Sequence, residues 1–141
     1  MSKKIYRIEI PMYGTFVNVV MGCTQREFLT WINKTYSEHF IEEDGDEGCS
    51  LYCRKDEKGK VDGGNFIWLR RFDWSTADQA LLGHEIVHTA MKILEIIGTK
   101  VTAETEEPFA YLVQEIMVKI WRKLAPLHPV RKIKLKRKKR K

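Results

Sequence analysis

The feature that most constrains this chain is a pair of histidines four residues apart, His84 and His88, within the segment Gly-His-Glu-Ile-Val-His. Positions four apart lie one above the other on a single helix face, so the two imidazoles can reach one ion. Glu85 lies about 100° further round such a helix, where its carboxylate could act on a water beside that ion. Two histidines, a third protein ligand and one position left to water describe a catalytic zinc site. The sequence therefore predicts a helix and a metal-binding face together.

The flanking residues predict that this helix spans about residues 76–97. Ser75 followed by Asp78 approximates a capping box, and Gly98 is placed to end the helix. Both sides of the helix carry small or apolar residues, so we expect both faces to be covered, as in a helix beneath an active-site cleft and unlike a surface helix. The apolar stripe contains Leu82, Ile86, Ala90, Ile93 and Ile97, and the small residues near the histidines are Ala77 and Ala80. Histidine has only an intermediate preference for burial, so packing alone explains the histidine pair poorly.

The composition indicates one domain with a hydrophobic core, since the chain has 141 residues of which 43% are hydrophobic. No stretch approaches the roughly 20 apolar residues of a membrane span. The N-terminus lacks the apolar core of a signal peptide, which predicts a cytoplasmic location. The odd number of cysteines fits reduced thiols better than a disulfide framework, although Cys49 and Cys53 could pair or bind metal.

The positive charge is concentrated at the C-terminus, where residues 131–141 contain nine lysines and arginines. Removing these nine charges from the formal total of +6 leaves −3 on residues 1–130. We therefore expect a folded domain over residues 1–129 and a basic, disordered tail over residues 130–141.

Hydrophobic periodicity predicts an α+β fold, a small twisted sheet packed on the histidine helix and on a second helix that begins with glutamates. The acidic segment 42–48 is predicted to be a solvated loop, with a calcium loop as the weaker alternative. The predicted strands are 4–10, 15–20, 49–54 and 65–71, and the predicted helices are 25–36, 76–97 and 105–124.

The third metal ligand is predicted to be Glu107. A third histidine at the spacing HExxHxxGxxH is excluded, because Met91 and Leu94 occupy the required glycine and histidine positions. The second long helix can run antiparallel to the first, which brings its start near the end of the first. Glu107 lies at the edge of that helix's apolar stripe, whereas Glu106 fits better as a first-turn acid favoured by the helix dipole. Two histidines stay open as alternatives, His39 and His128.

The order of elements resembles the minimal zincin domain of the gluzincin branch of peptidases. Residues 83–88 match its first motif in full, and residues 107–110 match the ExxA core of the second. The glutamate of that second motif is the third zinc ligand in families similar to the M48 and ImmA/IrrE peptidases. Short proteins with these features also resemble uncharacterised phage-encoded peptidases. The resemblance implies a zinc-dependent metalloendopeptidase, a hydrolase that holds Zn²⁺ through His84, His88 and Glu107.

The resemblance also implies roles for the neighbouring residues. Glu85 would be the general base, and a strand at the edge of the sheet would pair with the extended protein or peptide substrate. We take residues 65–71 as the candidate for that strand. Tyr111 stands where the family commonly has Asp or Asn, and it is a candidate hydrogen-bond donor to the oxyanion, with simple packing as the alternative.

Two other functions remain open on the sequence. The chain could be a nucleic-acid-associated protein that acts through Arg131–Lys141, with the histidine helix structural or inactive. It could also be an inactive scaffold that binds proteins, although such a scaffold would not need to retain Glu85. A role in solubility or sorting is the simplest alternative for the tail itself.

Deletion of residues 131–141 is expected to leave the fold and zinc binding intact and to abolish most binding to nucleic acid. If about five of the nine cations contact phosphates, log affinity should fall against log salt with a slope of roughly −4 to −5 in the full chain and near zero in the truncation. A salt titration on random-sequence duplex DNA measures both slopes. Failure of the full chain to bind duplex at low salt would exclude this role for the tail.

Overall fold

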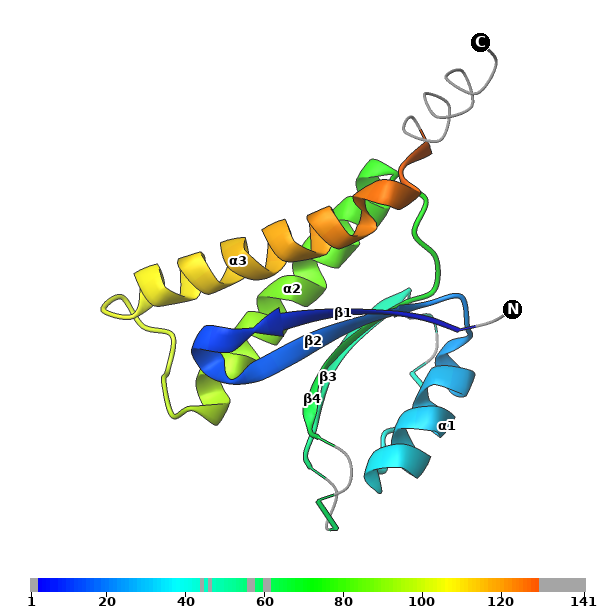
Figure 1. Ribbon diagram of the computed structural model, residues 1–141, viewed down its shortest axis with the longest axis horizontal. Helices are drawn as coiled ribbons and strands as arrows, with labels where there is room; N and C mark the ends of the chain where they lie inside the picture. Colours follow the sequence, from blue (N-terminus) through cyan, green and yellow to red (C-terminus); the bar gives the residue numbers. More distant parts are fainter. Residues whose placement is uncertain (1–2, 44, 46, 56–57, 60–61, 130–141) are drawn as a thin grey trace.

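The computed structural model describes residues 3–43, 45, 47–55, 58–59 and 62–129, and these form an α+β fold (Figure 1). The chain makes two strands and a helix, then two more strands and two long helices. The strands are β1 (Lys4–Ile10), β2 (Thr15–Met21), β3 (Gly48–Cys53) and β4 (Gly64–Leu69), and the helices are α1 (Gln25–Tyr36), α2 (Thr76–Ile96) and α3 (Glu106–Leu124). Short 3₁₀ turns follow β1 and α3, at Pro11–Tyr13 and Ala125–Leu127.

The four strands form one mixed sheet in the order β1-β2-β4-β3. The hairpin of β1 and β2 is antiparallel, as predicted, and β2 pairs in parallel with β4. Strand β3 pairs antiparallel with β4 and forms one edge of the sheet. All six residues of β4 are buried, because this strand has a partner on each side and a helical layer on each face.

Helix α1 covers one face of the sheet and helices α2 and α3 cover the other (Figure 1). The α1 layer is largely aromatic, with Phe28 stacked on Trp68 at 6.3 Å between ring centroids. Thr24 and Glu27 begin α1 with the predicted capping box, in which each side chain accepts the other residue's backbone N–H. This layer fixes the sheet from the side opposite the histidine helix.

Helices α2 and α3 run antiparallel and bury their apolar stripes in a common core with the sheet (Figure 1). Of the predicted α2 stripe, Leu82, Ile86, Ala90 and Ile93 are buried, whereas Ile97 is 52% exposed. The apolar stripe of α3 lies in the same core: its buried residues are Leu112, Ile116, Ile120 and Leu124, and Phe109, Val113 and Met117 pack beside them.

Several predicted element boundaries shift by one or two residues, and the predicted role of one strand is wrong. Strand β4 ends at Leu69 instead of residue 71, and it is the interior strand next to β3. The proposal that residues 65–71 pair with a substrate is therefore wrong, because both sides of β4 are occupied by β2 and β3. The predicted tail, residues 130–141, lies outside the described residues, as does part of the acidic segment 42–48.

Within the described ranges, no helix combines the length and apolar character needed to cross a membrane.

The two central positions of the histidine motif provide a matched test of how α2 packs. Ile86 is 0% exposed and Val87 is 37% exposed, although the two are neighbours. Ile86→Ala is expected to reduce the free energy of unfolding by about 2–5 kcal/mol because it leaves a cavity in the core. Val87→Ala should change it by about 0.5 kcal/mol or less. Urea denaturation followed by circular dichroism measures both, and equal losses would mean that α2 presents a different face to the sheet.

Candidate metal centre

The start of α2 is held by a compact set of hydrogen bonds at the turn after β4. Ser75 Oγ accepts the backbone N–H of Asp78 at 3.2 Å, and the Asp78 carboxylate accepts the backbone N–H of Asp73 at 2.7 Å. The backbone N–H of Ser75 donates to the Asp73 carboxylate at 2.8 Å, and this bond lowers the pKa of the Asp73 carboxyl. The predicted serine cap is confirmed, while Asp78 bonds to Asp73 instead of closing the capping box.

The end of α2 is the glycine stop that the sequence predicts. Gly98 has a φ of +79°, a conformation in which a side chain would be strained. Its backbone N–H donates to the carbonyl of Glu95 at 3.0 Å, and that of Thr99 donates to the carbonyl of Leu94 at 2.9 Å. The chain then passes residues 99–101 back beside α2, where they line a pocket with His88.

His84 and His88 converge on the exposed side of α2. Their Nε2 atoms are 3.1 Å apart, and both side chains are exposed. The expectation that both faces of this helix are covered is therefore wrong on the histidine side, where Ala77 and Ala80 are exposed as well. Imidazole nitrogens are among the ligands that zinc prefers, and the two rings would hold one ion together. The distance between the two Nε2 atoms is also that of a hydrogen bond if one of them carries the proton. The pair therefore fits two of the ligand positions of a zinc ion.

Glu85 is buried, and its carboxylate has no protein partner among the described residues. The residue is only 6% exposed, and among the described residues no hydrogen bond or ion pair reaches its carboxylate. Among the described residues, the fully enclosed side-chain atoms without a partner are the amide oxygens of Asn18 and Asn65, so the Glu85 oxygens retain contact with solvent. A carboxylate held in place by burial and still in contact with solvent is suited to exchange a proton with a nearby water.

The described residues do not bring a third metal ligand to His84 and His88. No group of three or more His, Cys, Asp or Glu side chains among the described residues is arranged to hold a metal ion. Glu107 and Glu106 both occupy the first turn of α3, and both are exposed. The assignment of Glu107 as a ligand stays a prediction.

The other residues considered for the site have definite positions. His39 lines a separate hollow beside α1, on the opposite face of the sheet from α2. The ring of His128 packs against Trp74 with 4.8 Å between centroids, next to the start of α2. Tyr111 is 67% exposed, so the alternative that it packs in the core is wrong, and its role toward an oxyanion stays a prediction.

None of the three cysteines forms a disulfide. Cys53 is 0% exposed, and burial raises the pKa of its thiol to about 12. A thiol with this pKa is protonated at neutral pH and is a poor metal ligand. Pairing or metal binding by Cys49 and Cys53 therefore gains no support from the fold.

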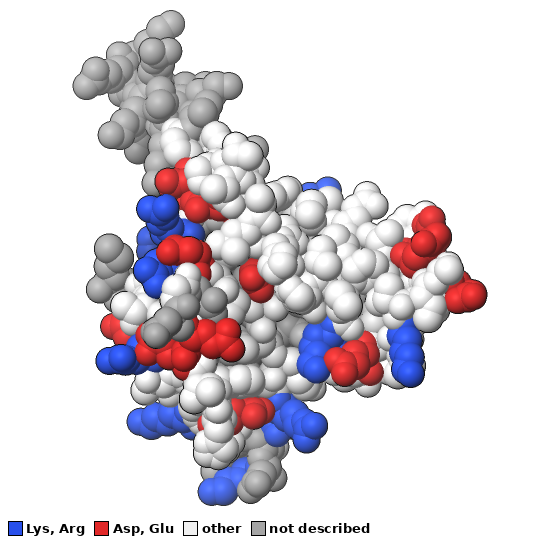
Figure 2. Space-filling view, turned by 180° about the vertical axis from the view of Figure 1, so that it is seen from behind, with Lys and Arg blue, Asp and Glu red and all other residues white. Residues whose placement is uncertain are grey.

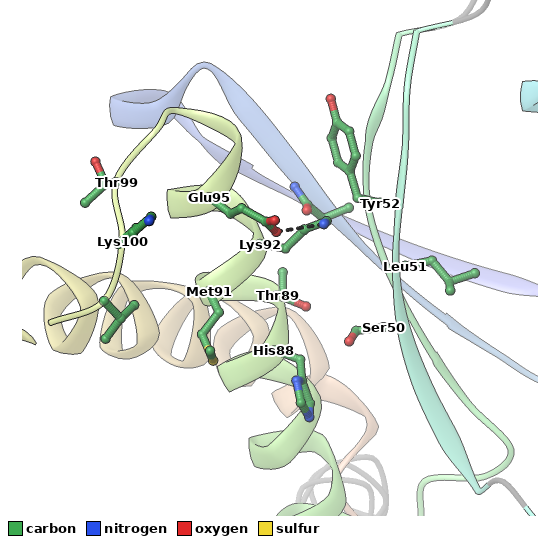
Figure 3. A pocket seen from close by; sticks show the side chains of 12 residues that line it. Ser50, Leu51, Tyr52, His88, Thr89, Met91, Lys92, Glu95, Thr99 and Lys100 are labelled. Carbon is green, nitrogen blue, oxygen red and sulfur yellow. Dashed lines mark hydrogen bonds and ion pairs between the residues drawn. The ribbon is translucent and has the colours of Figure 1, made fainter.

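A pocket beside His88 was not predicted from the sequence. It extends over one side of α2, from the edge strand β3 to the 99–101 segment, with α2 between these two (Figure 3). Ser50 and Tyr52 of β3 line it opposite His88 and Thr89 of α2, and Asn65 of β4 also contributes. The signal that could have found it is Asn65, a polar residue in an otherwise apolar strand.

The charges of the folded body are mixed. Figure 2 shows basic and acidic side chains interspersed on the face seen there, without a continuous basic surface among the residues it colours. Neighbouring surface charges also pair with each other, as Lys92 does with Glu95 at 2.7 Å. On this face the folded body offers no basic surface that would support the hypothesis of nucleic-acid binding.

No family model matches the chain, and no curated protein or solved structure matches it.

We expect the purified protein to bind about one zinc ion per chain, and His84→Ala or His88→Ala to remove it, because each change deletes one of two converging nitrogens. Elemental analysis of protein prepared without chelators measures the stoichiometry, and circular dichroism checks that these exposed substitutions leave the fold intact. Absence of zinc from the unmodified protein, even after incubation with zinc salts, would contradict the centre.

Glu107 and Glu106 form a matched pair for the third ligand. Glu107→Ala should weaken zinc binding about 10- to 100-fold, the scale seen when support for a metal is lost, and Glu106→Ala should barely change it. Competition with a chromogenic chelator measures both affinities. The reverse ranking would move the ligand by one residue, and two unchanged affinities would exclude both glutamates.

Proposed function

We propose that this chain is a zinc-dependent metallopeptidase that cleaves an extended polypeptide lying along strand β3. The observation that carries the proposal is the 3.1 Å convergence of the His84 and His88 Nε2 atoms next to Glu85, a buried carboxylate without a partner among the described residues. The α+β fold and the order of its elements are compatible with a zincin-like domain.

In the proposed hydrolysis, the zinc ion and the side chain of Glu85 would have separate roles. Zinc held by His84, His88 and Glu107 would supply Lewis acidity, which polarises a carbonyl and acidifies water. Glu85 accepts the proton of the attacking water and returns it to the leaving amide nitrogen. Burial of its stem within α2 restricts the carboxylate, and its contact with solvent lets it exchange a proton between turnovers.

The substrate position follows from the edge of the sheet. Among the described strands β3 pairs with β4 only, so its other side is the edge of the sheet at which a further strand could add. The strand also packs against α2: a side-chain atom added to Gly48 would lie 3.3 Å from Leu81, and Ser50 and Tyr52 share a pocket with His88. A peptide paired with β3 would therefore pass the histidine pair.

The proposal is tested by Glu85→Gln, which removes the proton acceptor and preserves the size of the side chain. We expect zinc binding to persist and peptide hydrolysis to fall by about 10²- to 10⁴-fold, the usual contribution of a general base. The matched control is Glu106→Gln, an exposed glutamate at the start of α3. Mass spectrometry of a digested proteome incubated with the zinc-loaded protein detects cleavage without assuming a sequence.

Two results would contradict the proposal. One is the absence of any new peptide terminus after incubation with the zinc-loaded protein. The other is cleavage that survives Glu85→Gln unchanged, because the buried carboxylate would then have no part in the reaction.

A further inference from the structure

The exposed side of α2 carries no charged side chain over most of its length. Every exposed residue of the helix from Thr76 to Met91 is uncharged, with histidine counted as neutral, and exposed charge begins only at Lys92. The two acids in that span, Asp78 and Glu85, are both buried. The solvent face of a helix is normally charged or polar, and 31% of this chain is charged. An exposed face without charge is typical of a surface that binds a partner.

Most of these uncharged residues form one stripe along the helix. They recur at intervals of three, four and seven residues, the spacing of side chains that meet a second helix. The sheet and α3 pack on the opposite, buried stripe of α2, so this stripe is left at the surface of the described chain. Figure 3 shows two of its members, His88 and Met91, projecting from α2. The stripe consists of Ala77, Ala80, His84, Val87, His88 and Met91.

The histidine pair lies in the middle of this stripe, and its metal coordination is incomplete. His84 and His88 offer two nitrogens to one ion, and no further metal-binding side chain among the described residues joins them. Zinc in a structural site takes four protein ligands. A two-fold interface places the same surface of each copy face to face, so a second copy would bring the same two nitrogens. Four imidazoles would complete the site.

We propose that this stripe binds a second copy of the chain, in a zinc-bridged homodimer held by His84 and His88 of both copies. The inference goes beyond the proposed peptidase function and uses the same histidines. Because four protein ligands leave no position for water, the dimer would be an inactive form of the proposed enzyme. The dimer forms when zinc is scarce relative to protein, whereas excess zinc gives each chain its own ion.

An antiparallel crossing of the two α2 helices suits the side chains along the stripe. With the two-fold axis between His84 and His88, the small Ala80 of each copy faces the part of the other helix that carries Met91. Large side chains therefore meet small ones. Lys92 also faces the alanine end of the other helix instead of the other copy's Lys92, so like charges stay apart. Antiparallel helix dipoles add a favourable interaction.

Sedimentation velocity of the full chain, first freed of metal and then titrated with zinc, tests the dimer. The dimer is expected to reach a maximum at one zinc per two chains, to decline as zinc exceeds one per chain, and to dissociate with a chelator. X-ray absorption spectroscopy should count four imidazoles around the zinc at the maximum and two in excess zinc. A chain that stays monomeric at every zinc ratio would overturn the proposal, as would two imidazoles per zinc in the dimer.

Substitutions on and off the stripe locate the interface. His88→Ala should abolish zinc-dependent dimerisation, and His39→Ala, the same change on the other face of the sheet, should leave it intact. Ala80→Lys should weaken the dimer at least about tenfold, because it adds a cation close to Lys92 of the other copy. Gln79→Lys is the matched control, an exposed position next to Ala80 but off the stripe, and should have little effect. Circular dichroism checks that each variant is folded.

Glu107→Ala separates this inference from the proposed function. The four-imidazole site does not use Glu107, so the dimer should persist in this variant while peptide cleavage falls. A zinc-bridged dimer in a chain that cleaves no peptide would support the inference and count against the peptidase alone. Dimerisation that survives His88→Ala, or that is lost in Glu107→Ala, would overturn the four-imidazole bridge and leave the peptidase standing.

Discussion

The packing of α2 against the sheet is the constraint on which the rest of the structure depends. Its apolar stripe, with Leu82, Ile86 and Ile93, is buried between α3 and the strands. At 3.6 residues per turn, burying that stripe leaves His84 and His88 on the exposed side. The hydrogen bonds around Ser75 and the turn at Gly98 then fix where α2 begins and ends. The direction of the two imidazoles is thus a consequence of core packing.

Buried polar side chains lie at the boundary between the buried and exposed sides of α2. Glu85 and Thr89 lie there, both buried, and Thr89 Oγ1 donates to the carbonyl of Glu85 at 2.8 Å. Asn65 lies across the same boundary on β4, with its Oδ1 unpartnered. The Asn65 Nδ2 donates to Thr15 Oγ1 and to the carbonyl of Phe16, so this residue ties β4 to the start of β2. Glu85 has no such structural bond to its carboxylate among the described residues, and a role in proton transfer would account for it.

The strand order decides where a substrate can lie. Because β4 pairs with β2 and β3, its six buried residues are closed to a further strand, whereas β3 keeps one side open next to α2. The sequence already contains a signal that residues 65–71 include an interior strand, which cannot pair with a substrate. A continuous apolar run such as Phe66–Leu69 is typical of a strand buried on both faces, and the more mixed residues of β3 are typical of an edge. Chain order alone suggested otherwise, since β4 directly precedes α2.

The sequence by itself determined the α+β class, the bounds of the helices to within one or two residues, and the histidine pair with Glu85. These follow from short-range rules: capping residues, apolar periodicity and the spacing of positions on one helix face. Only the tertiary structure decided that β3 is the edge strand and that Asn65 and Lys100 share a pocket with His88. Those residues are far apart along the chain and belong to separate elements. Their proximity therefore depends on strand order and on how α2 crosses the sheet, which no local pattern encodes.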